Sequence, residues 1–150
     1  MKRTEGRLRL CTCLLIALLV FIWGNSLLPG EISGRVSQWV KDHLFPFMTP
    51  GQQTGHGLLR KLAHFTEFAC LGACFLWRSK MLSKKLWVPF AASILVACID
   101  ETIQLFVPDR GPAVRDVAID GAGAACGILA LLLGNLIYTK CKMNIGGTKQ

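Results

Sequence analysis

Carboxylates occur in several stretches of this sequence that are otherwise apolar enough to cross a membrane. They are Glu67, Asp100, Glu101 and Asp120, out of nine acidic residues in the whole chain. A carboxylate inside a bilayer costs free energy unless it is paired, hydrated or neutralised. Because nearly half of the acidic residues occupy such costly positions, we expect them to belong to a functional site.

The surrounding residues could perform acid–base chemistry or bind an anion. His64 and Glu67 are three residues apart, so on a helix they share a face and Glu67 could orient His64 as a general base. Glu67 or Asp100 could act as a general acid. We therefore take as candidate catalytic residues His64, Glu67, Asp100 and Glu101. Cationic and polar candidates for substrate binding are Lys61, Gln104, Arg110, Arg115, Asp116 and Asp120.

The composition indicates one integral membrane unit. Of the 150 residues 52% are hydrophobic and 17% are charged, against roughly 25% charged in a soluble domain. The net charge of +8 does not indicate nucleic-acid binding, because the basic residues lie in clusters between the apolar stretches. The seven cysteines are odd in number and lack paired spacing, which argues against a disulfide framework or a zinc ribbon.

Four apolar stretches are predicted to form membrane-spanning helices in an all-α bundle. Residues 10–28 carry no charge and are long enough to cross a hydrocarbon core of ~30 Å. The other spans are expected at about 58–77, 86–107 and 117–139. The basic N-terminus raises the alternative of a signal peptide, but the apolar run is long for one and no A-x-A site follows, which favours an uncleaved helix.

The distribution of basic residues predicts the orientation. Of the 17 Lys and Arg residues, 11 lie on one side of the predicted spans and 6 on the other. The positive-inside rule then places both termini in the cytoplasm. We expect a cytoplasmic segment over 1–9, a transmembrane domain over 10–139 and a cytoplasmic tail over 140–150.

This topology gathers the polar residues at the external ends of the spans. Lys61, His64 and Glu67 fall in the outer half of the second span. Asp100 and Gln104, four residues apart, share a face of the third span. Asp116 and Asp120 begin the fourth span from outside. We therefore expect a polar pocket at the extracytoplasmic end of the bundle, where opposite charges offset part of the desolvation cost.

Two further patterns concern packing. Ile32, Val36 and Trp39 recur at helical spacing after the first span and predict a short helix that ends before Pro46 and Pro50. It could lie on the membrane surface or cover the bundle. In the fourth span Gly123 and Gly127 form a GxxxG pattern, which favours close packing within the chain and leaves a homodimer through this face as an alternative.

Three ordered blocks of residues resemble the VanZ-like family. They are Arg60-Lys61-x-x-His64-Phe65-x-Glu67-Phe68, then Asp100-Glu101-x-x-Gln104-x-Phe106-x-Pro108-x-Arg110, then Asp116-x-x-x-Asp120-x-x-Gly123-x-x-x-Gly127. Asn25-Ser26, Pro29 and Ser33 also resemble that pattern. The resemblance implies a small, multi-pass protein of the bacterial inner membrane, possessing a helical bundle and a link to resistance against the glycopeptide teicoplanin. The family usually has Asn at the position of Asp120, so this chain replaces a neutral side chain with a charged one.

Several functions remain open at this stage. The protein could be an enzyme that acts on a lipid headgroup or a lipid-linked envelope precursor at the outer leaflet, or a non-catalytic protein that binds such a component. A third alternative is a structural polar network that only fixes helix packing. A transporter is disfavoured, because polar groups in one half of the bundle offer no path across it.

We expect membrane lipids or an envelope precursor as partners, and no cofactor. A divalent metal is a side hypothesis, because His64, Glu67, Asp100, Glu101 and Asp116 offer imidazole and oxygen ligands. The spacing matches no specific metal motif, and the nearby cations disfavour an ion, so the sequence assigns no metal ligand.

Overall fold

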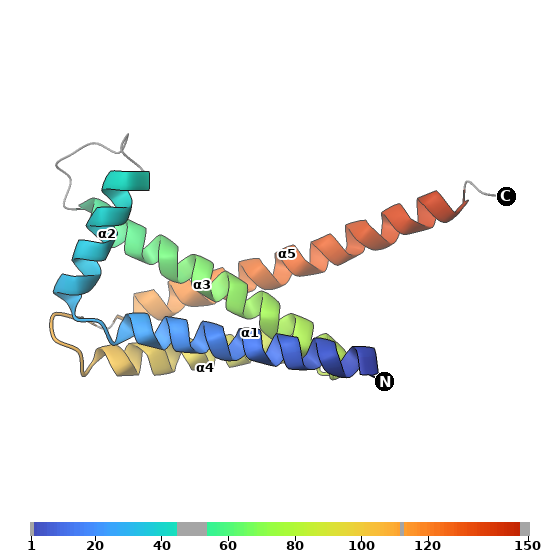
Figure 1. Cartoon of the computed structure of the whole chain (residues 1–150), viewed down its shortest axis with the longest axis horizontal. Helices are drawn as coiled ribbons and strands as arrows, with labels where there is room; N and C mark the ends of the chain where they lie inside the picture. The colour runs from blue at the N-terminus through green and yellow to red at the C-terminus, as the bar shows by residue number, and fades with distance from the viewer. Residues whose placement is uncertain (1, 45–53, 112, 148–150) are drawn as a thin grey trace.

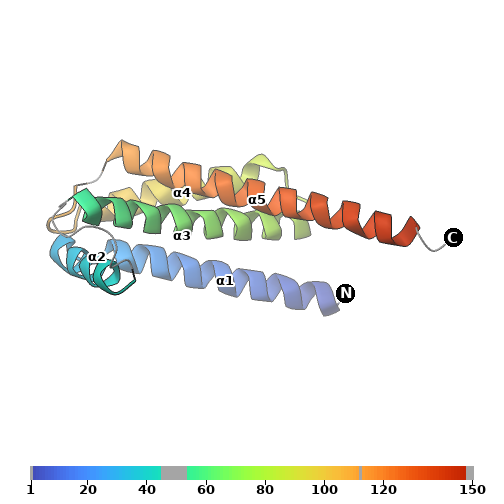
Figure 2. The same ribbon diagram turned by 90° about the horizontal axis from the view of Figure 1, so that it is seen from above.

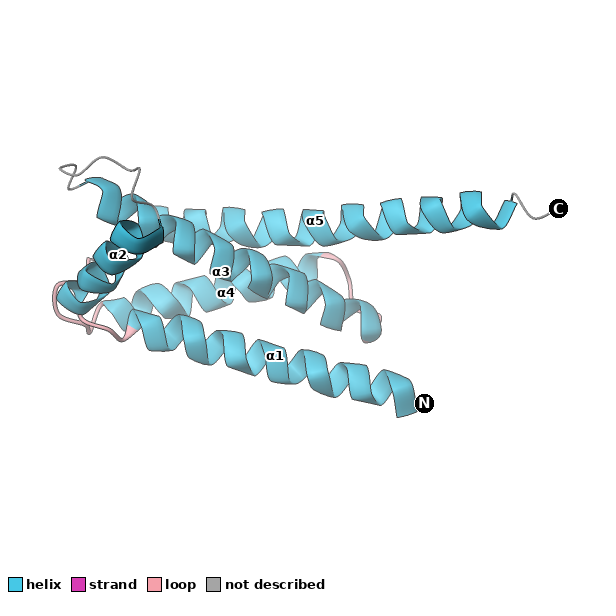
Figure 3. Ribbon diagram, turned by 45° about the horizontal axis from the view of Figure 1, so that its top comes forward, coloured by secondary structure: helices cyan, strands magenta, loops and turns pink. Residues whose placement is uncertain are grey.

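A computed structural model describes residues 2–44, 54–111 and 113–147. This part of the chain consists of five α-helices and contains no strand (Figure 3). The helices are α1 (Lys2–Ser26), α2 (Gly30–Leu44), α3 (Thr54–Met81), α4 (Trp87–Gln104) and α5 (Val114–Gly147). The predicted all-α fold is confirmed.

Among the described residues, three helices are long and apolar enough to cross a membrane. The stretches concerned are Thr4–Ser26 in α1, Trp87–Gln104 in α4 and Val114–Met143 in α5. Helix α3 has sufficient length, with 28 residues, but charged residues such as Lys61 and Glu67 interrupt its apolar run. The count of four spans therefore stays a prediction with respect to α3. Helices α1 and α5 also continue through most of the predicted terminal segments.

Helix α3 is the centre of the bundle, because it contacts each of the other four helices. Helices α1, α3, α4 and α5 run roughly along the long axis, whereas α2 turns away at one end (Figures 1 and 2). Both termini and the α3–α4 connection lie at the opposite end (Figure 1). The end at which α2 lies, called the α2 end below, holds the last turns of α1 and α4 and the first turns of α3 and α5.

The closest packing lies between α3 and α5, where small residues let the two backbones approach. A Cβ atom on Gly123 would collide with the backbone of Phe65, and one on Gly127 would collide with that of Ala69. The GxxxG pattern is thus used within the chain. A homodimer through Gly123 and Gly127 stays a prediction, and a second chain would have to compete with α3 for this face.

Helix α2 matches the short helix expected after the first span. Its side chains Ile32, Val36 and Trp39 are exposed over about half of their surface, at 46%, 53% and 59%. The helix therefore presents an apolar strip to its surroundings, as a helix at a membrane surface does. It ends at Leu44, and the predicted stop signals Pro46 and Pro50 lie outside the described residues.

Candidate functional site

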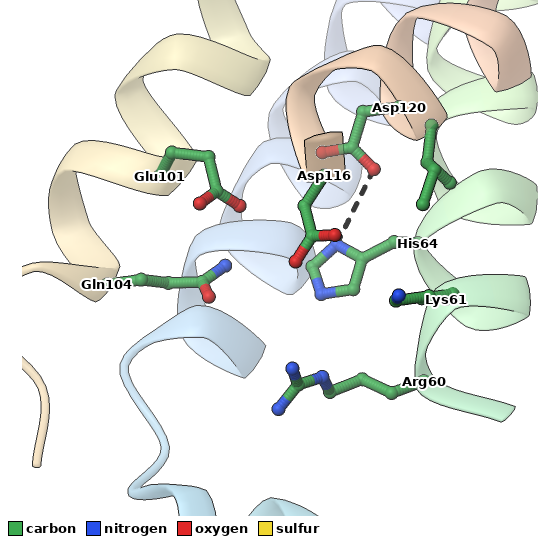
Figure 4. Close-up of a pocket in the computed structure, with 8 residues that line it drawn as sticks. Arg60, Lys61, His64, Glu101, Gln104, Asp116 and Asp120 are labelled. Atoms are coloured by element: carbon green, nitrogen blue, oxygen red, sulfur yellow. Dashed lines mark ion pairs between the residues drawn. The ribbon is translucent and has the colours of Figure 1, made fainter. Parts of the chain in front are cut away.

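A small polar cavity of about 10 Å³ lies at the α2 end between α3, α4 and α5 (Figure 4). It is lined by Arg60, Lys61, His64, Glu101, Gln104, Asp116, Ile119 and Asp120. Six of these residues are candidates from the sequence, and the structure brings them together at one cavity. The volume is about that of a single water-sized probe.

Three buried side chains meet beside this cavity. His64, Asp100 and Asp120 each offer a ligand atom, and these atoms lie within 4.8 Å of one another. The Nδ1 atom of His64 is 3.9 Å from Oδ1 of Asp120, as the dashed line in Figure 4 marks. That separation exceeds a hydrogen bond. The two carboxylates are almost inaccessible, at 0% and 1% exposure.

The hydrogen bonding of this group is incomplete. Gln104 donates from Nε2 to Oδ2 of Asp100 at 2.9 Å and lies 3.4 Å from the Ser26 hydroxyl, which joins α4 to α1. The buried atoms without a hydrogen-bond partner include His64 Nδ1, Asp100 Oδ1 and both carboxylate oxygens of Asp120. An unpaired buried polar group costs about 1–3 kcal/mol. These unpaired atoms therefore cost folding free energy that a group serving packing alone would not need to spend.

Two predicted candidates have partners that tie elements together. Oε2 of Glu101 accepts a hydrogen bond from the backbone N–H of Ala113 at 2.9 Å, directly before α5 begins. Oε1 of Glu67 lies 3.5 Å from Nδ2 of Asn25 on α1, while its Oε2 is buried without a partner. Glu67 lies outside the lining of the polar cavity.

The side chain of Arg110 donates hydrogen bonds to backbone carbonyls at and just after the end of α1. Its Nε donates to the carbonyl oxygen of Leu28 at 3.1 Å and its Nη2 to that of Asn25 at 3.0 Å. Asn25 lies in the last turn of α1, where carbonyls lack helical partners, and Leu28 lies in the segment that follows the helix. Burial, reinforced by nearby Arg60, lowers the pKa of the guanidinium, which stays charged at neutral pH. Neither Arg110 nor the exposed Arg115 lines the polar cavity.

A second, larger space adjoins the site. A groove of about 840 Å³ runs between α1, α2 and α3. Its walls are mostly apolar and include Phe21, Leu28, Val36 and Leu62. Asn25 and Glu67 line it from within the bundle, and Arg60 lines both this groove and the polar cavity.

Arg60 was not among the candidate site residues. It precedes Lys61 in the first block of the resemblance, and its half-buried side chain extends beside the cavity (Figure 4). The adjacent pair of basic residues before His64 was the available signal. Asn25 and Ser26 were likewise noted only as part of the resemblance, since uncharged residues at the end of an apolar helix do not stand out.

Comparison with known proteins decides the family. The family model described as VanZ/LLP1 matches residues 11–136. The chain belongs to the VanZ/LLP1 family. This match runs from Cys11 within α1 through most of α5 and includes all three blocks singled out in the sequence. A search of curated proteins and a search of solved structures each found no significant match. Family membership and the three apolar helices together mark this VanZ/LLP1 protein as a membrane protein.

Proposed function

We propose that this VanZ/LLP1 protein binds an envelope lipid or lipid-linked precursor with an anionic headgroup at the extracytoplasmic end of a four-span bundle. The observation that carries the proposal is the position of Arg60, which lines both the polar cavity and the apolar groove. An amphiphile needs such a junction, because its chain seeks apolar walls while its headgroup seeks a cation.

The proposed topology includes α3 as the fourth span. Helix α3 lies among the three apolar helices and contacts all of them. Both termini lie at the same end of the bundle (Figure 1), as an even number of crossings requires. The distribution of Lys and Arg favours cytoplasmic termini, so the α2 end would face outward. The bacterial inner membrane is what the family resemblance implies.

The apolar groove is the proposed binding site of the lipid's acyl or prenyl chain. Its volume of about 840 Å³ falls in the range of about 300–1,000 Å³ typical of small-molecule sites. Its α1 wall includes Val20 and Phe21, which are 66% and 60% exposed. The groove is therefore bordered by side chains that would face lipid tails.

The headgroup would lie at the mouth of the polar cavity. A cavity of about 10 Å³ cannot enclose a phosphate group, but Arg60 and Lys61 are only half-buried and can present their charged ends to it. His64, Glu101 and Asp120 are more deeply buried. Binding would change how accessible an envelope precursor is to a glycopeptide. A link to teicoplanin resistance would arise in this way.

Unpaired polar atoms favour a binding site over a purely structural network. A network that fixes helix packing gains most when each buried donor and acceptor is satisfied. Here Glu67, Asp100, Asp120 and His64 all keep buried atoms without partners. The unpaired carboxylate oxygens could accept hydrogen bonds from hydroxyl groups of a ligand, while its anionic group would meet Arg60 and Lys61. Catalysis is the second candidate, because His64 and Asp120 are 3.9 Å apart beside the cavity and could exchange protons with a bound group.

Lipid binding by the purified protein in neutral detergent tests the proposal. Thermal unfolding is followed while phosphatidylglycerol or zwitterionic phosphatidylcholine is added. We expect phosphatidylglycerol to bind more tightly, and Arg60→Ala to weaken it about tenfold, the equivalent of one charge-assisted hydrogen bond. The matched control is Arg35→Ala, because Arg35 is exposed on α2 and lines neither space.

A second pair of variants tests the groove. Gly24 lines it and has open space around a Cβ atom, so Gly24→Trp should fill the groove and weaken binding of either lipid. Gly34→Trp is the control, since Gly34 also has open space but does not line this groove. If Gly24→Trp bound lipid as tightly as wild type does, the groove would not be the binding site of the lipid's acyl or prenyl chain. Mass spectrometry of the lipid after incubation separates binding from turnover.

A further inference from the structure

The group formed by His64, Asp100 and Asp120 has the composition of a cation site. The three residues come from α3, α4 and α5, and their ligand atoms lie within 4.8 Å of one another. All three side chains are buried, with residue exposures of 9%, 0% and 1%. Helices that are far apart in the sequence therefore bring one imidazole and two carboxylates to a single point.

Charge at this point is unbalanced. In the described part of the chain neither Asp100 nor Asp120 forms an ion pair with Lys or Arg, and the single contact to a basic group is with the His64 ring. Four buried atoms of these three residues have no hydrogen-bond partner, namely His64 Nδ1, Asp100 Oδ1, Asp120 Oδ1 and Asp120 Oδ2. Two buried carboxylates repel each other unless a positive charge lies between them.

We propose that His64, Asp100 and Asp120 bind a divalent first-row transition metal ion. A neutral imidazole, two carboxylates and a divalent cation sum to zero net charge, which removes the main cost of burying this group. Metal–nitrogen and metal–oxygen bonds of about 2.0–2.2 Å place two ligand atoms at most ~4.3 Å apart. The 3.9 Å between His64 Nδ1 and Asp120 Oδ1 is too long for a hydrogen bond but fits two ligands of one ion. The bound of 4.8 Å on the separations among all three ligand atoms means that binding an ion requires them to close by ~0.5 Å at most.

The surroundings also resemble those of a metal centre. Ligating carboxylates are usually held by a further hydrogen bond, and Gln104 supplies one to Oδ2 of Asp100 while leaving Oδ1 free. Three protein ligands leave a coordination position open. The polar cavity, which His64 and Asp120 help to line, lies on the side from which a further ligand could approach.

The mixed donor set selects the class of ion. One imidazole and two carboxylates suit Mn²⁺, Fe²⁺ or Zn²⁺, whereas thiolate-seeking ions such as Cu⁺ prefer sulfur. The sequence argument against a metal rested on the lack of a metal motif and on three nearby cations. Of these cations, Arg110 bonds to backbone carbonyls at and after the end of α1 and Arg115 is exposed. Lys61 lines the cavity together with Arg60, and both are only half-buried, whereas the three proposed ligands are buried.

Mn²⁺ is the first probe, because it prefers oxygen and nitrogen ligands over the cysteines of this chain. The full-length protein is purified in neutral detergent, treated with a chelator and titrated with Mn²⁺ in the absence of lipid. We expect one ion per chain and a rise in the unfolding temperature, since an ion that binds the folded state stabilises it. Electron spin-echo spectra should show coupling to an imidazole nitrogen.

Variants assign the ligands. His64→Ala, Asp100→Asn and Asp120→Asn should each weaken Mn²⁺ binding by about 100-fold or more, given that loss of a supporting residue alone costs about 10–100-fold. The control variant carries His43→Ala and Asp42→Asn, which remove the same residue types from the exposed surface of α2. It should bind as wild type does.

Two results would overturn the proposal. One is wild-type protein that takes up neither Mn²⁺ nor Zn²⁺ at millimolar concentration, or that binds Mn²⁺ without imidazole coupling. The other is undiminished binding by folded Asp120→Asn. If the variants fail to fold, the spectrum of the wild type still decides. Because lipid is absent throughout, failure here leaves the proposed headgroup site untouched, and failure of lipid binding leaves the metal site untouched.

Discussion

Two parts of this bundle are built on opposite principles. Along the seam between α3 and α5, Gly123 and Gly127 bring backbones together and leave no room for a side chain. At the α2 end, Asp100 and Asp120 bury charges that the chain leaves partly unsatisfied. Stability in a membrane comes from close packing of the first kind. The contrast teaches that the polar group is an addition to a bundle already held by its seam.

Substitutions along the seam should lower stability more than substitutions in the polar group at the α2 end. Gly127→Ile places a side chain against the backbone of Ala69, which cannot move aside as a side chain would, and overpacking of this kind costs about 3 kcal/mol or more. We expect the largest loss of stability of any variant considered, measured by thermal unfolding in detergent. Gly134→Ile is the control, because a Cβ on Gly134 meets nothing within 4 Å. Similar losses in both would show that the seam does not dominate.

Arg110 tests whether the α2 end is held by fixed contacts as well. Arg110→Ala removes two hydrogen bonds, one to the last turn of α1 and one to Leu28 just after it, and should cost about 2 kcal/mol, as bonds to a charged group do. Arg110→Lys keeps the charge but not the forked geometry, so it should recover only part of the loss. The exposed Arg115, changed to Ala, should stay within about 0.5 kcal/mol of wild type. If Arg110→Ala unfolded at the same temperature as wild type, the hydrogen bonds of Arg110 near the end of α1 would not contribute to stability.

The polar group should respond in the opposite direction to the seam. Asp120→Asn removes a buried charge while keeping the shape, so in metal-free protein we expect stability to rise by about 1 kcal/mol. The measurement is unfolding after chelation, compared with Gly127→Ile and wild type. A clear loss of stability would mean that the Asp120 carboxylate holds the bundle together, and the contrast between the two regions would fail.

The sequence predicted the gathering of polar residues better than their individual roles. Apolar spans and alternating direction place Lys61, His64, Asp100 and Asp120 at one end whatever the side-chain details. The pairing of Arg110 with α1 was beyond prediction, because it depends on the path of a loop of nine residues between α4 and α5. Arg60 was overlooked for a related reason. Helical spacing assigns a face, but only tertiary structure shows that this face borders both a groove and a cavity.

Glu101 provides the finest test, since it was a catalytic candidate yet makes a contact of structural kind. Glu101→Ala removes the acceptor of the Ala113 N–H and should cost about 1 kcal/mol, whereas Glu101→Gln keeps an acceptor oxygen and should unfold within about 0.5 kcal/mol of wild type. Lipid and Mn²⁺ binding by Glu101→Gln should also match wild type. If Glu101→Gln instead lost binding while keeping its stability, Glu101 would belong with Asp100 and Asp120 among the ligand-seeking carboxylates. Glu101 both lines the cavity and accepts the hydrogen bond at the start of α5. That result would therefore mean that a carboxylate which holds the backbone can also take part in binding a ligand.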